Sequence, residues 1–314
     1  MKLPRTLSVA ALLVLSLCPI SAAQSVNEFL GRWDLTLKAP DREYPSWLEL
    51  REEGGQLKAE MVGRWGNARP LPEASITNGR LTFVSPKEEE DAKTDMVFEG
   101  TLSDNRLSGT VNGPDGRIWT WTGRRAPALK RTGTPKWGKP VALFNGKDLT
   151  GWKMSPADSA KAWKVEHGLL VTPGNGPELI NDQKFEDFKL HVEFKCDENS
   201  NSGIYLRGRY EVQIETDSIE EPPSHHMGGV YGFLAPTPEL PRQPGTWQTY
   251  DITLIGQRIT VVLNGQTIID NKEIPGITGG ALDSHEELPG PIYLQGSEKG
   301  RVEFRSIVIT PAAR

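Results

Sequence analysis

Cysteine is nearly absent from this 314-residue chain, which contains only Cys18 and Cys196. Cys18 falls in a predicted signal peptide, so the exported chain would keep Cys196 alone and could form no intrachain disulfide. Cys196 shares the alternating register of apolar Val192 and Phe194, which predicts a buried small hydrophobe rather than a reactive thiol. Stability must therefore come from buried apolar area.

Long apolar runs are lacking as well. The stretch Leu7–Leu17 is well short of the ~20 residues that a membrane-spanning helix needs. A short basic region before it and the small residues Ser21–Ala23 after it predict a secretory signal peptide over residues 1–23. A lipid-anchored Cys18 is the alternative, which the following Pro19 fits poorly. We expect export to the periplasm or the extracellular space, and no membrane span.

A basic excess is also missing, because 36 Lys and Arg face 41 Asp and Glu, for a net charge of −5. No basic patch with interleaved aromatics stands out, so we expect no nucleic-acid partner. No cofactor is firmly implied. A divalent metal stays an unassigned option, since neither an HxxxH motif nor paired cysteines are found. The oligomeric state is not predicted.

Helical periodicity is scarce, whereas 32 Gly, 24 Pro and 9 Trp indicate β structure with many turns. Residues 24–123 show short alternating runs separated by turn pairs such as Asn78-Gly79, which predicts a small antiparallel β-barrel or sandwich of about six to eight strands, of unknown role. The basic stretch 124–140 is predicted to be a linker. Residues 141–314 contain further antiparallel strands with long connections, which favours a two-sheet sandwich.

One segment carries most of the functional argument, and its pattern predicts a single strand over Gly203–Thr216. The even positions from Ile204 to Ile214 are apolar apart from Gly208, as a core face requires. The odd positions are polar or aromatic: Tyr205, Arg207, Arg209, Glu211, Gln213, Glu215 and Asp217. A merely solvated face would show the same alternation. The mixture of guanidinium, carboxylate and amide groups nevertheless suits the hydroxyls of a sugar.

The chain resembles the bacterial 3-keto-disaccharide hydrolase domain family over residues 141–311. The matching blocks, in order, are LFNGKDLTGW (143–152), NSGIYLR (201–207), YEVQI (210–214), GVYGFLAP (229–236), WQTYD (247–251), LNG (263–265), GPIYLQG (290–296) and VEFRSI (302–307). The resemblance does not include residues 24–123. It implies a concanavalin-like jelly roll with a concave sugar site.

The resemblance also implies an oligosaccharide or glycoside substrate whose glucose-type ring is already oxidised to a ketone at C3. Such a ketone acidifies the C2 hydrogen, so that a base can remove it while the C1 leaving group departs, and water then adds. The enzyme needs that base, an electrophile for the enolate oxygen, and an acid beside the glycosidic oxygen. Whether cleavage is hydrolytic or eliminative is left open by the residues.

We assign candidate roles on this basis. The catalytic candidates are Glu211, Glu215 and His226, with neighbouring His225 as a second acid/base source unless both histidines are simply exposed loop residues. Arg207 could stabilise the enolate. The substrate-binding candidates are Tyr205, Arg207, Gln213, Tyr231, Trp247 and Gln295. Relatives commonly carry a His after the Leu-Gln block near 294–297, and this chain does not, so His226 would have to replace it.

Two other functions fit the same segment. Glu211, Gln213 and Glu215 resemble the Glu-x-Asp-x-Glu signature of jelly-roll β-glucanases, although Gln replaces the Asp. Their outer Cα atoms would lie roughly 13 Å apart along a strand, and the side chains would have to lean together to reach a retaining separation of ~5 Å. Alternatively, Tyr205, Tyr231 and Trp247 would hold glycan in a non-catalytic, lectin-like module.

Overall fold

The structure is a computed structural model that describes residues 25–64, 66–89, 92–157, 163–172, 174–216 and 220–313. The predicted signal peptide, with Cys18, lies outside these ranges. The described helical elements are short 3-10 turns: η1 (Val26–Glu28), η2 (Lys87–Glu89) and η3 (Pro223–His225). No helix within the described ranges is long and apolar enough to cross a membrane. The prediction of an all-β fold is confirmed.

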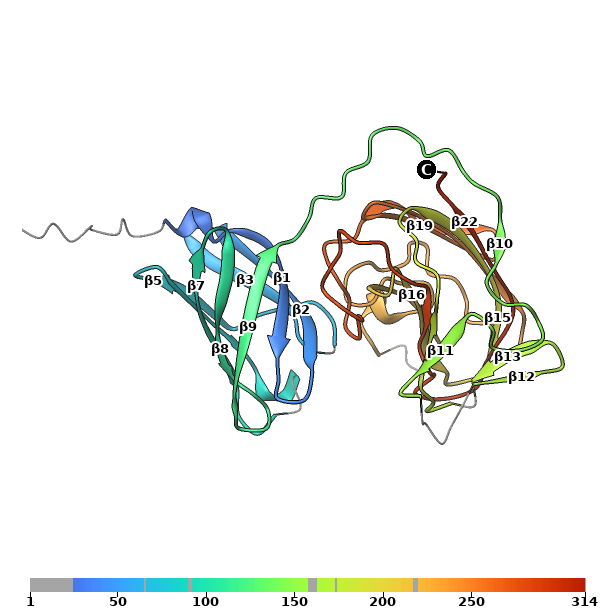
Figure 1. Ribbon diagram of the computed structural model, residues 1–314, viewed down its shortest axis with the longest axis horizontal. Coiled ribbons are helices and arrows are strands. Elements are labelled where there is room, and N and C mark those ends of the chain that lie inside the picture. The colour runs from blue at the N-terminus through green and yellow to red at the C-terminus, as the bar shows by residue number, and fades with distance from the viewer. Residues whose placement is uncertain are drawn as a thin grey trace, which may run out of the picture.

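The amino-terminal part forms one antiparallel nine-stranded sheet, in the order β4-β3-β2-β1-β9-β8-β7-β6-β5. Its strands are β1 (Gly31–Lys38), β2 (Glu43–Glu53), β3 (Gln56–Val62), β4 (Arg69–Pro70), β5 (Glu73–Thr77), β6 (Arg80–Ser85), β7 (Met96–Ser103), β8 (Arg106–Asn112) and β9 (Ile118–Arg125). The sheet curls until β5 approaches β3 (Figure 1). Buried side chains such as Trp33, Phe98 and Trp121 fill its interior. It has more strands than the six to eight expected, since β4 and β5 are too short to give a clear alternation.

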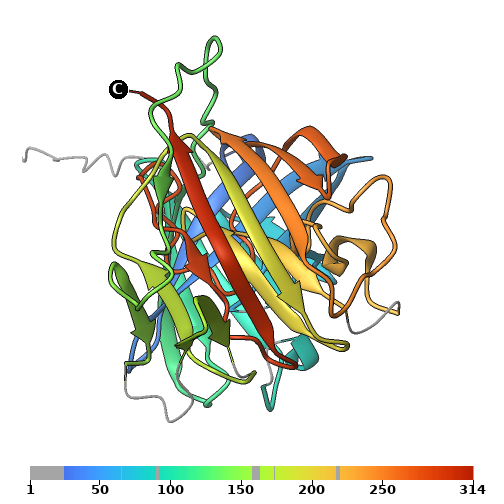
Figure 2. The ribbon, with the colours of Figure 1, turned by 90° about the vertical axis from the view of Figure 1, so that its right-hand side faces the viewer.

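The carboxy-terminal part is a sandwich of two antiparallel sheets. The larger has the order β12-β13-β22-β15-β18-β19-β20, with β10 paired to β22, and the smaller has the order β11-β14-β21-β16-β17. In the larger sheet, β22 (red) runs between its neighbours (Figure 2). The strands are β10 (Val141–Ala142), β11 (Trp152–Ser155), β12 (Lys164–Glu166), β13 (Leu169–Thr172), β14 (Glu178–Asn181), β15 (Phe188–Cys196), β16 (Asn201–Leu206), β17 (Tyr210–Glu215), β18 (Gln248–Ile255), β19 (Arg258–Leu263), β20 (Gln266–Glu273), β21 (Tyr293–Leu294) and β22 (Val302–Pro311). This is the expected concanavalin-like jelly-roll sandwich.

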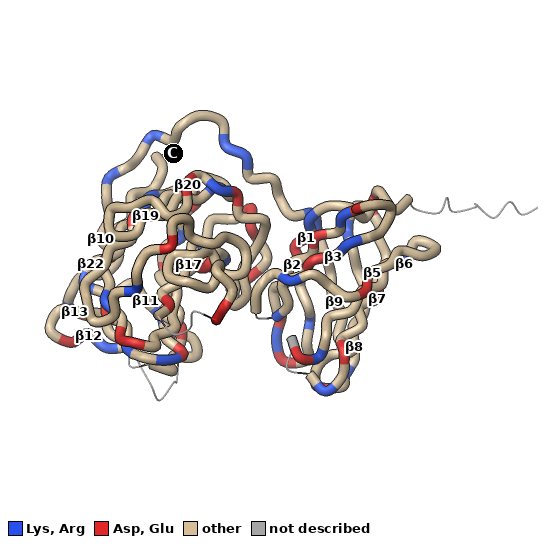
Figure 3. Tube along the Cα trace, turned by 180° about the vertical axis from the view of Figure 1, so that it is seen from behind, with Lys and Arg blue, Asp and Glu red and all other residues tan. Residues whose placement is uncertain are grey.

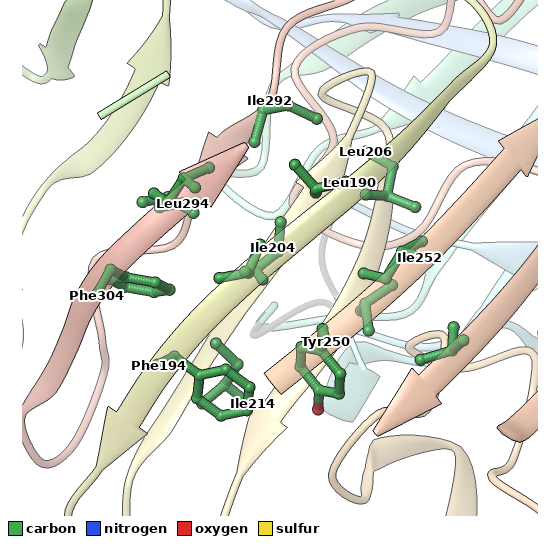
Figure 4. Close-up of a cluster of buried hydrophobic side chains, with 14 of the residues drawn as sticks. Leu190, Phe194, Ile204, Leu206, Ile214, Tyr250, Ile252, Ile292, Leu294 and Phe304 are labelled. Atoms are coloured by element: carbon green, nitrogen blue, oxygen red, sulfur yellow. The ribbon is translucent and has the colours of Figure 1, made fainter. Parts of the chain in front are cut away.

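Alternate side chains of both sheets meet in one apolar core. Ile204 and Leu294 from the smaller sheet point toward Phe194 and Ile252 from the larger one (Figure 4). Cys196 is fully buried in this core, and burial raises the pKa of its thiol to about 12. The thiol is therefore protonated at neutral pH, as expected of a small hydrophobe.

A linker over residues 126–140 joins the two parts and arches from β9 to β10 (Figure 1). Basic positions follow one another along it (Figure 3). The predicted linker began at Arg124, but Arg124 and Arg125 still belong to β9 because they pair with Asp34 and Trp33 of β1.

The curled sheet packs directly against the sandwich. Trp47 meets Phe233 edge-on at 5.4 Å between ring centroids, within an apolar cluster that also includes Ile277. The backbones approach so closely that a Cβ on Gly279 would lie 2.3 Å from the Gly66 carbonyl oxygen. Such tight contact excludes water and makes the two parts one packed body.

Polar groups at this interface include two carboxyl groups in contact. Asp34 of β1 and Glu286 of the 282–290 segment are both buried and share a side-chain hydrogen bond. Two carboxylates cannot hydrogen-bond without a proton between them. Burial, followed by the charge of Glu286, holds the pKa of Asp34 far above its ordinary value. The guanidinium of Arg124 lies 3.8 Å from Asp34 but is engaged in a 2.6 Å pair with Glu287.

We expect the contact between the two parts to weaken in alkali. The packed form binds a proton at Asp34 that the separated form releases, so stability falls as pH rises above the ordinary carboxyl range. Asp34→Asn removes this dependence, because its amide N–H donates to the Glu286 carboxylate without a shared proton. Thermal unfolding between pH 6 and 10 measures both variants. Glu52→Gln, an exposed position on β2, should keep the wild-type slope; equal slopes for wild type and Asp34→Asn would contradict the shared proton.

Candidate active site

The candidate site is built on a hairpin formed by β16 and β17. The prediction of one continuous strand over Gly203–Thr216 is wrong, because the chain reverses at 207–209, where Arg207 and Gly208 have φ of 53° and 68°. Leu206 lies opposite Tyr210 in the antiparallel pair. Since the turn has three residues, paired positions keep the same parity, and the odd-numbered residues of both strands share one face.

Rows of side chains cross the outer face of the smaller sheet, the face away from the core. The pairs within the hairpin are Tyr205 with Glu211, Gly203 with Gln213, and Asn201 with Glu215. β21 places Tyr293 beside Tyr205, and β14 follows β21. The hairpin and its neighbouring strands therefore bring together groups that a single strand would have spread along a line. We call this set the grid; its residues are Glu178, Tyr205, Glu211, Gln213, Glu215, Tyr293 and Gln295.

This polar face is buried, whereas the sequence pattern indicated an open surface. The segment 228–231 pairs with the edge of β17: the Gln213 N–H donates to the Gly229 carbonyl (2.9 Å), and the Tyr231 N–H to the Glu211 carbonyl (3.1 Å). Glu211 N–H also donates to the hydroxyl of Thr278 (3.1 Å). As a result the Glu211 residue is only 2% exposed. Burial of this kind shifts the pKa of an ionisable group strongly.

Glu211 is held as a neutral carboxylic acid. Burial is the main reason that its pKa is raised well above the ordinary value. The Tyr205 hydroxyl lies 2.9 Å from Glu211 Oε2 and 2.7 Å from the Gly279 carbonyl oxygen. Because that hydroxyl has one proton and a carbonyl only accepts, both contacts are satisfied when Tyr205 donates to Gly279 and Glu211 donates to Tyr205. Glu211 thus carries a proton at neutral pH.

Gly203 makes room for the Glu211 side chain. A Cβ at this position would lie 2.1 Å from Glu211 Oε1 and 2.8 Å from its carboxyl carbon. The carboxyl group therefore rests directly over the backbone of β16. Only glycine leaves this space, which explains the Asn-Ser-Gly sequence at the start of that strand.

A second carboxyl group, Glu178 of β14, lies at the other end of the grid. Its Oε2 accepts a 2.8 Å hydrogen bond from the Gly296 N–H, and the nearby Tyr293 hydroxyl also favours its charged form. Burial raises the pKa of Glu178 to about 7. Sequence reasoning missed Glu178 and Tyr293, because β14 and β21 are too short to reveal which side chains face the site.

Three buried oxygen atoms around Gly203 lack a hydrogen-bond partner among the described residues: Glu211 Oε1, Gln213 Oε1 and Gln295 Oε1. Gln213 lies opposite Gly203, and Gln295 donates its N–H to the Gly203 carbonyl at 2.9 Å, so the amides flank that glycine. Leaving a buried acceptor unpaired costs about 1–3 kcal/mol. Such atoms indicate a place where a polyhydroxylated ligand completes the bonding.

The two histidines differ in their surroundings. His226 Nε2 lies 3.0 Å from the Glu221 carbonyl oxygen, and its Nδ1 lies 2.9 Å from Glu239 Oε1, at ion-pair distance but without a hydrogen bond. The ring of His225 stacks on Tyr231 at 4.4 Å, and its Nε2 has no partner among the described residues. Burial lowers the pKa of His225. The geometry thus favours His225 over the predicted His226 as an acid/base group beside the grid.

Two predicted binding residues lie away from the grid. Arg207 lies in the turn, where the alternation of faces ends. Its guanidinium donates to the Tyr210 hydroxyl at 2.8 Å, on the core side of β17. Trp247 lies on the outer face of the larger sheet, under the side chains of Lys195 and Arg305. The roles predicted for Arg207 at the enolate and for Trp247 in sugar stacking have no support from these positions.

Within the described ranges, no set of three His, Cys, Asp or Glu side chains is arranged to hold a metal ion. A cavity of about 380 Å³ lies elsewhere, between the linker at 126–131 and the strands β18 to β20. The polar grid, rather than that cavity, brings together acid/base groups.

Comparison with known proteins gives a family assignment. Residues 139–310 match the 3-keto-alpha-glucoside-1,2-lyase-like domain family. The chain belongs to this family. The whole grid, from Glu178 to Gln295, lies inside the family domain, whereas the curled sheet with Asp34 lies outside it. The resemblance noted in the sequence is thereby confirmed.

Individual relatives are more distant. A 3-keto-disaccharide hydrolase of Bacteroides thetaiotaomicron is 31% identical over 75 residues, which are 21% of this chain and 26% of that protein. The chain thus spans about a quarter of the length of this curated relative. Two solved structures of candidate glycosyl hydrolases from Parabacteroides distasonis are 27% and 26% identical, cover 57% and 55% of this chain and 92% and 98% of theirs, and have TM-scores of 0.46 and 0.43.

The raised pKa of Glu178 predicts a pH-dependent stability. The native state keeps a proton on Glu178 up to about pH 7, whereas the unfolded state loses it near the ordinary value. The free energy of unfolding therefore falls between these pH values, by on the order of 1–3 kcal/mol. Glu178→Gln should flatten this part of a urea-unfolding series. Exposed Glu186→Gln is the control, and an unchanged slope in Glu178→Gln would contradict the shift.

The contact between Gly203 and Glu211 predicts a specific destabilisation. Gly203→Ala should lower the free energy of unfolding by about 1–3 kcal/mol, because the new methyl group overlaps the Glu211 carboxyl. In a Glu211→Ala background the same change should cost little, since the obstructing atoms are gone. A double-mutant cycle by chemical unfolding measures the difference; purely additive costs would show that the overlap is not the cause.

Proposed function

We propose that this protein cleaves the glycosidic bond of 3-keto-glucosides or 3-keto-disaccharides by acid/base elimination, followed by addition of water. Family membership supports the substrate class. The observation that carries the proposal is the grid around Gly203, where a neutral buried carboxylic acid lies beside two amides with unpaired oxygen atoms. A carboxyl group and amides are the groups needed to protonate a leaving oxygen and to hold ring hydroxyls.

Glu211 is the proposed acid. In the elimination, a base takes the C2 proton, the C2–H electrons form the C1=C2 double bond, and the C1–O bond breaks. The departing oxygen takes the proton of Glu211, which becomes a carboxylate. Because burial raises the pKa of Glu211, the acid carries its proton before the substrate arrives.

His225 is the proposed base. Burial lowers the pKa of its imidazole, so the ring is neutral near pH 7 and Nε2 accepts a proton. Its ring stacks on Tyr231, whose N–H bonds the Glu211 carbonyl, so base and acid lie along the same edge of β17. Glu215, also buried on this face, is the alternative base that the sequence pattern predicts.

Product analysis tests the function. The purified chain should cleave a 3-keto-disaccharide and leave the unoxidised parent intact, because only the ketone acidifies C2. Glu211→Gln should lower kcat by about 10²–10⁴-fold with little change in KM, since the amide can still donate to Tyr205 but provides no acidic proton. His225→Gln should lower kcat similarly, and Glu186→Gln should behave as wild type.

Other outcomes would favour the other functions. Equal cleavage of the unoxidised disaccharide, lost in Glu211→Gln and Glu215→Gln, would overturn the elimination and favour a β-glucanase-like hydrolase. Sugar binding without cleavage of either compound would favour a lectin-like module.

A further inference from the structure

Four ionisable side chains form a continuous row across four strands of the smaller sheet. Tyr293 of β21 lies between Glu178 of β14 and Tyr205 of β16, and its hydroxyl, which also donates to the Gly280 carbonyl at 3.4 Å, acts on the pKa of Glu178. The two tyrosine rings are stacked in parallel, with 4.1 Å between centroids. Tyr205 in turn meets Glu211 of β17 at 2.9 Å. The row therefore places two phenol hydroxyls between two carboxyl groups.

Burial along this row is unequal. Glu211, Tyr205 and Tyr293 are each 2% exposed, whereas Glu178 is only partly buried. The charged groups that act on Glu211 are Glu178, Glu298 and Glu215, all of them acidic. An ionised Glu211 would thus be enclosed beside acidic side chains, which is unfavourable, and it must regain a proton quickly. The partly exposed end of the row is the one that can exchange protons with solvent.

We propose that Tyr293 and Tyr205 form a relay that returns protons from Glu178 to Glu211 after each turnover. The relay rests on the proposed function, in which Glu211 gives its proton to the leaving oxygen. Glu178 thereby becomes a functional residue that does not touch the substrate but resupplies the acid that does.

The proton transfers balance along the row. Glu178 takes a proton from solvent and passes it to the oxygen of Tyr293 as the Tyr293 O–H proton moves to Tyr205. The Tyr205 proton moves to Glu211, which is restored as a carboxylic acid. Each O–H bond that breaks is replaced by the next one formed, so one proton travels inward, no electron is transferred and no residue is altered. The base at the other side of the substrate releases the C2 proton to solvent, which closes the cycle.

The ordinary pKa of a tyrosine, near 10, does not prevent this step. Burial raises the pKa of both tyrosines further, so neither becomes a stable phenolate. Each passes one proton on while it receives another, as a hydroxyl in a hydrogen-bonded chain does. The pKa of Glu178, about 7, lets it pick up a proton and give it away at neutral pH.

A pre-steady-state experiment with Tyr293→Phe tests the relay. The substitution removes the hydroxyl and keeps the ring that stacks on Tyr205. In rapid-quench assays with a 3-keto-disaccharide, the variant should release about one product per site at the wild-type rate, because Glu211 starts protonated. Later turnovers should be at least about tenfold slower, whereas wild type shows no such burst. Tyr44→Phe, a tyrosine stacked on Trp119 in the curled sheet, is the matched control.

Two results would overturn the relay. One is a wild-type steady-state rate in Tyr293→Phe, and the other is an equal slowing of burst and steady state, which would indicate that Tyr293 only positions Glu211. Inactivity of the wild type toward the keto sugar would instead count against the proposed function. In that case ¹³C titration of the carboxyl groups decides: Tyr205→Phe should shift the titration of Glu178 as well as that of Glu211, and an unmoved Glu178 would refute the linkage.

Discussion

Antiparallel pairing of β16 with β17 across a three-residue turn is the constraint on which the site depends. The turn keeps odd-numbered residues of both strands on one face, so Tyr205 meets Glu211 and Gly203 meets Gln213. A turn one residue longer or shorter would place polar groups of one strand in the core and apolar groups in the site. Pairing of β16 with β21 then adds Tyr293, and β14 adds Glu178.

Glu211 and Asp34 are both buried carboxyl groups that keep a proton, and both do so for the same physical reason. Glu211 lies among acidic neighbours, and Asp34 contacts Glu286 where the curled sheet meets the sandwich. In a low-dielectric interior an ionised carboxylate is costly, so a proton is retained instead. At the interface this proton contributes to packing. In the site the proton is chemically useful, because an acid that stays protonated at neutral pH can give its proton to a leaving group.

Alternation in the sequence was sufficient for the all-β class, the two-sheet sandwich and the face on which Glu211 and Gln213 lie. It did not reveal the reversal at 207–209, because Arg-Gly-Arg continues the alternation and is not a typical two-residue turn pair. Trp247 was assigned to the site as an aromatic residue of a family block. It directly precedes β18, which pairs with β15 in the opposite sheet, and it lies there under the side chain of Lys195.

The amino-acid sequence by itself determined which residues alternate between core and polar face, and its ordered blocks were enough to recognise the family. Only the tertiary structure decided which carboxyl group is an acid, since a pKa depends on burial and on neighbours far away in the chain. Glu178, Tyr205, Glu211 and Tyr293 come from four strands and meet only when the smaller sheet forms. Likewise, the choice of His225 over His226 depends on which ring stacks on Tyr231, and adjacent residues in a loop do not carry that information in their identity.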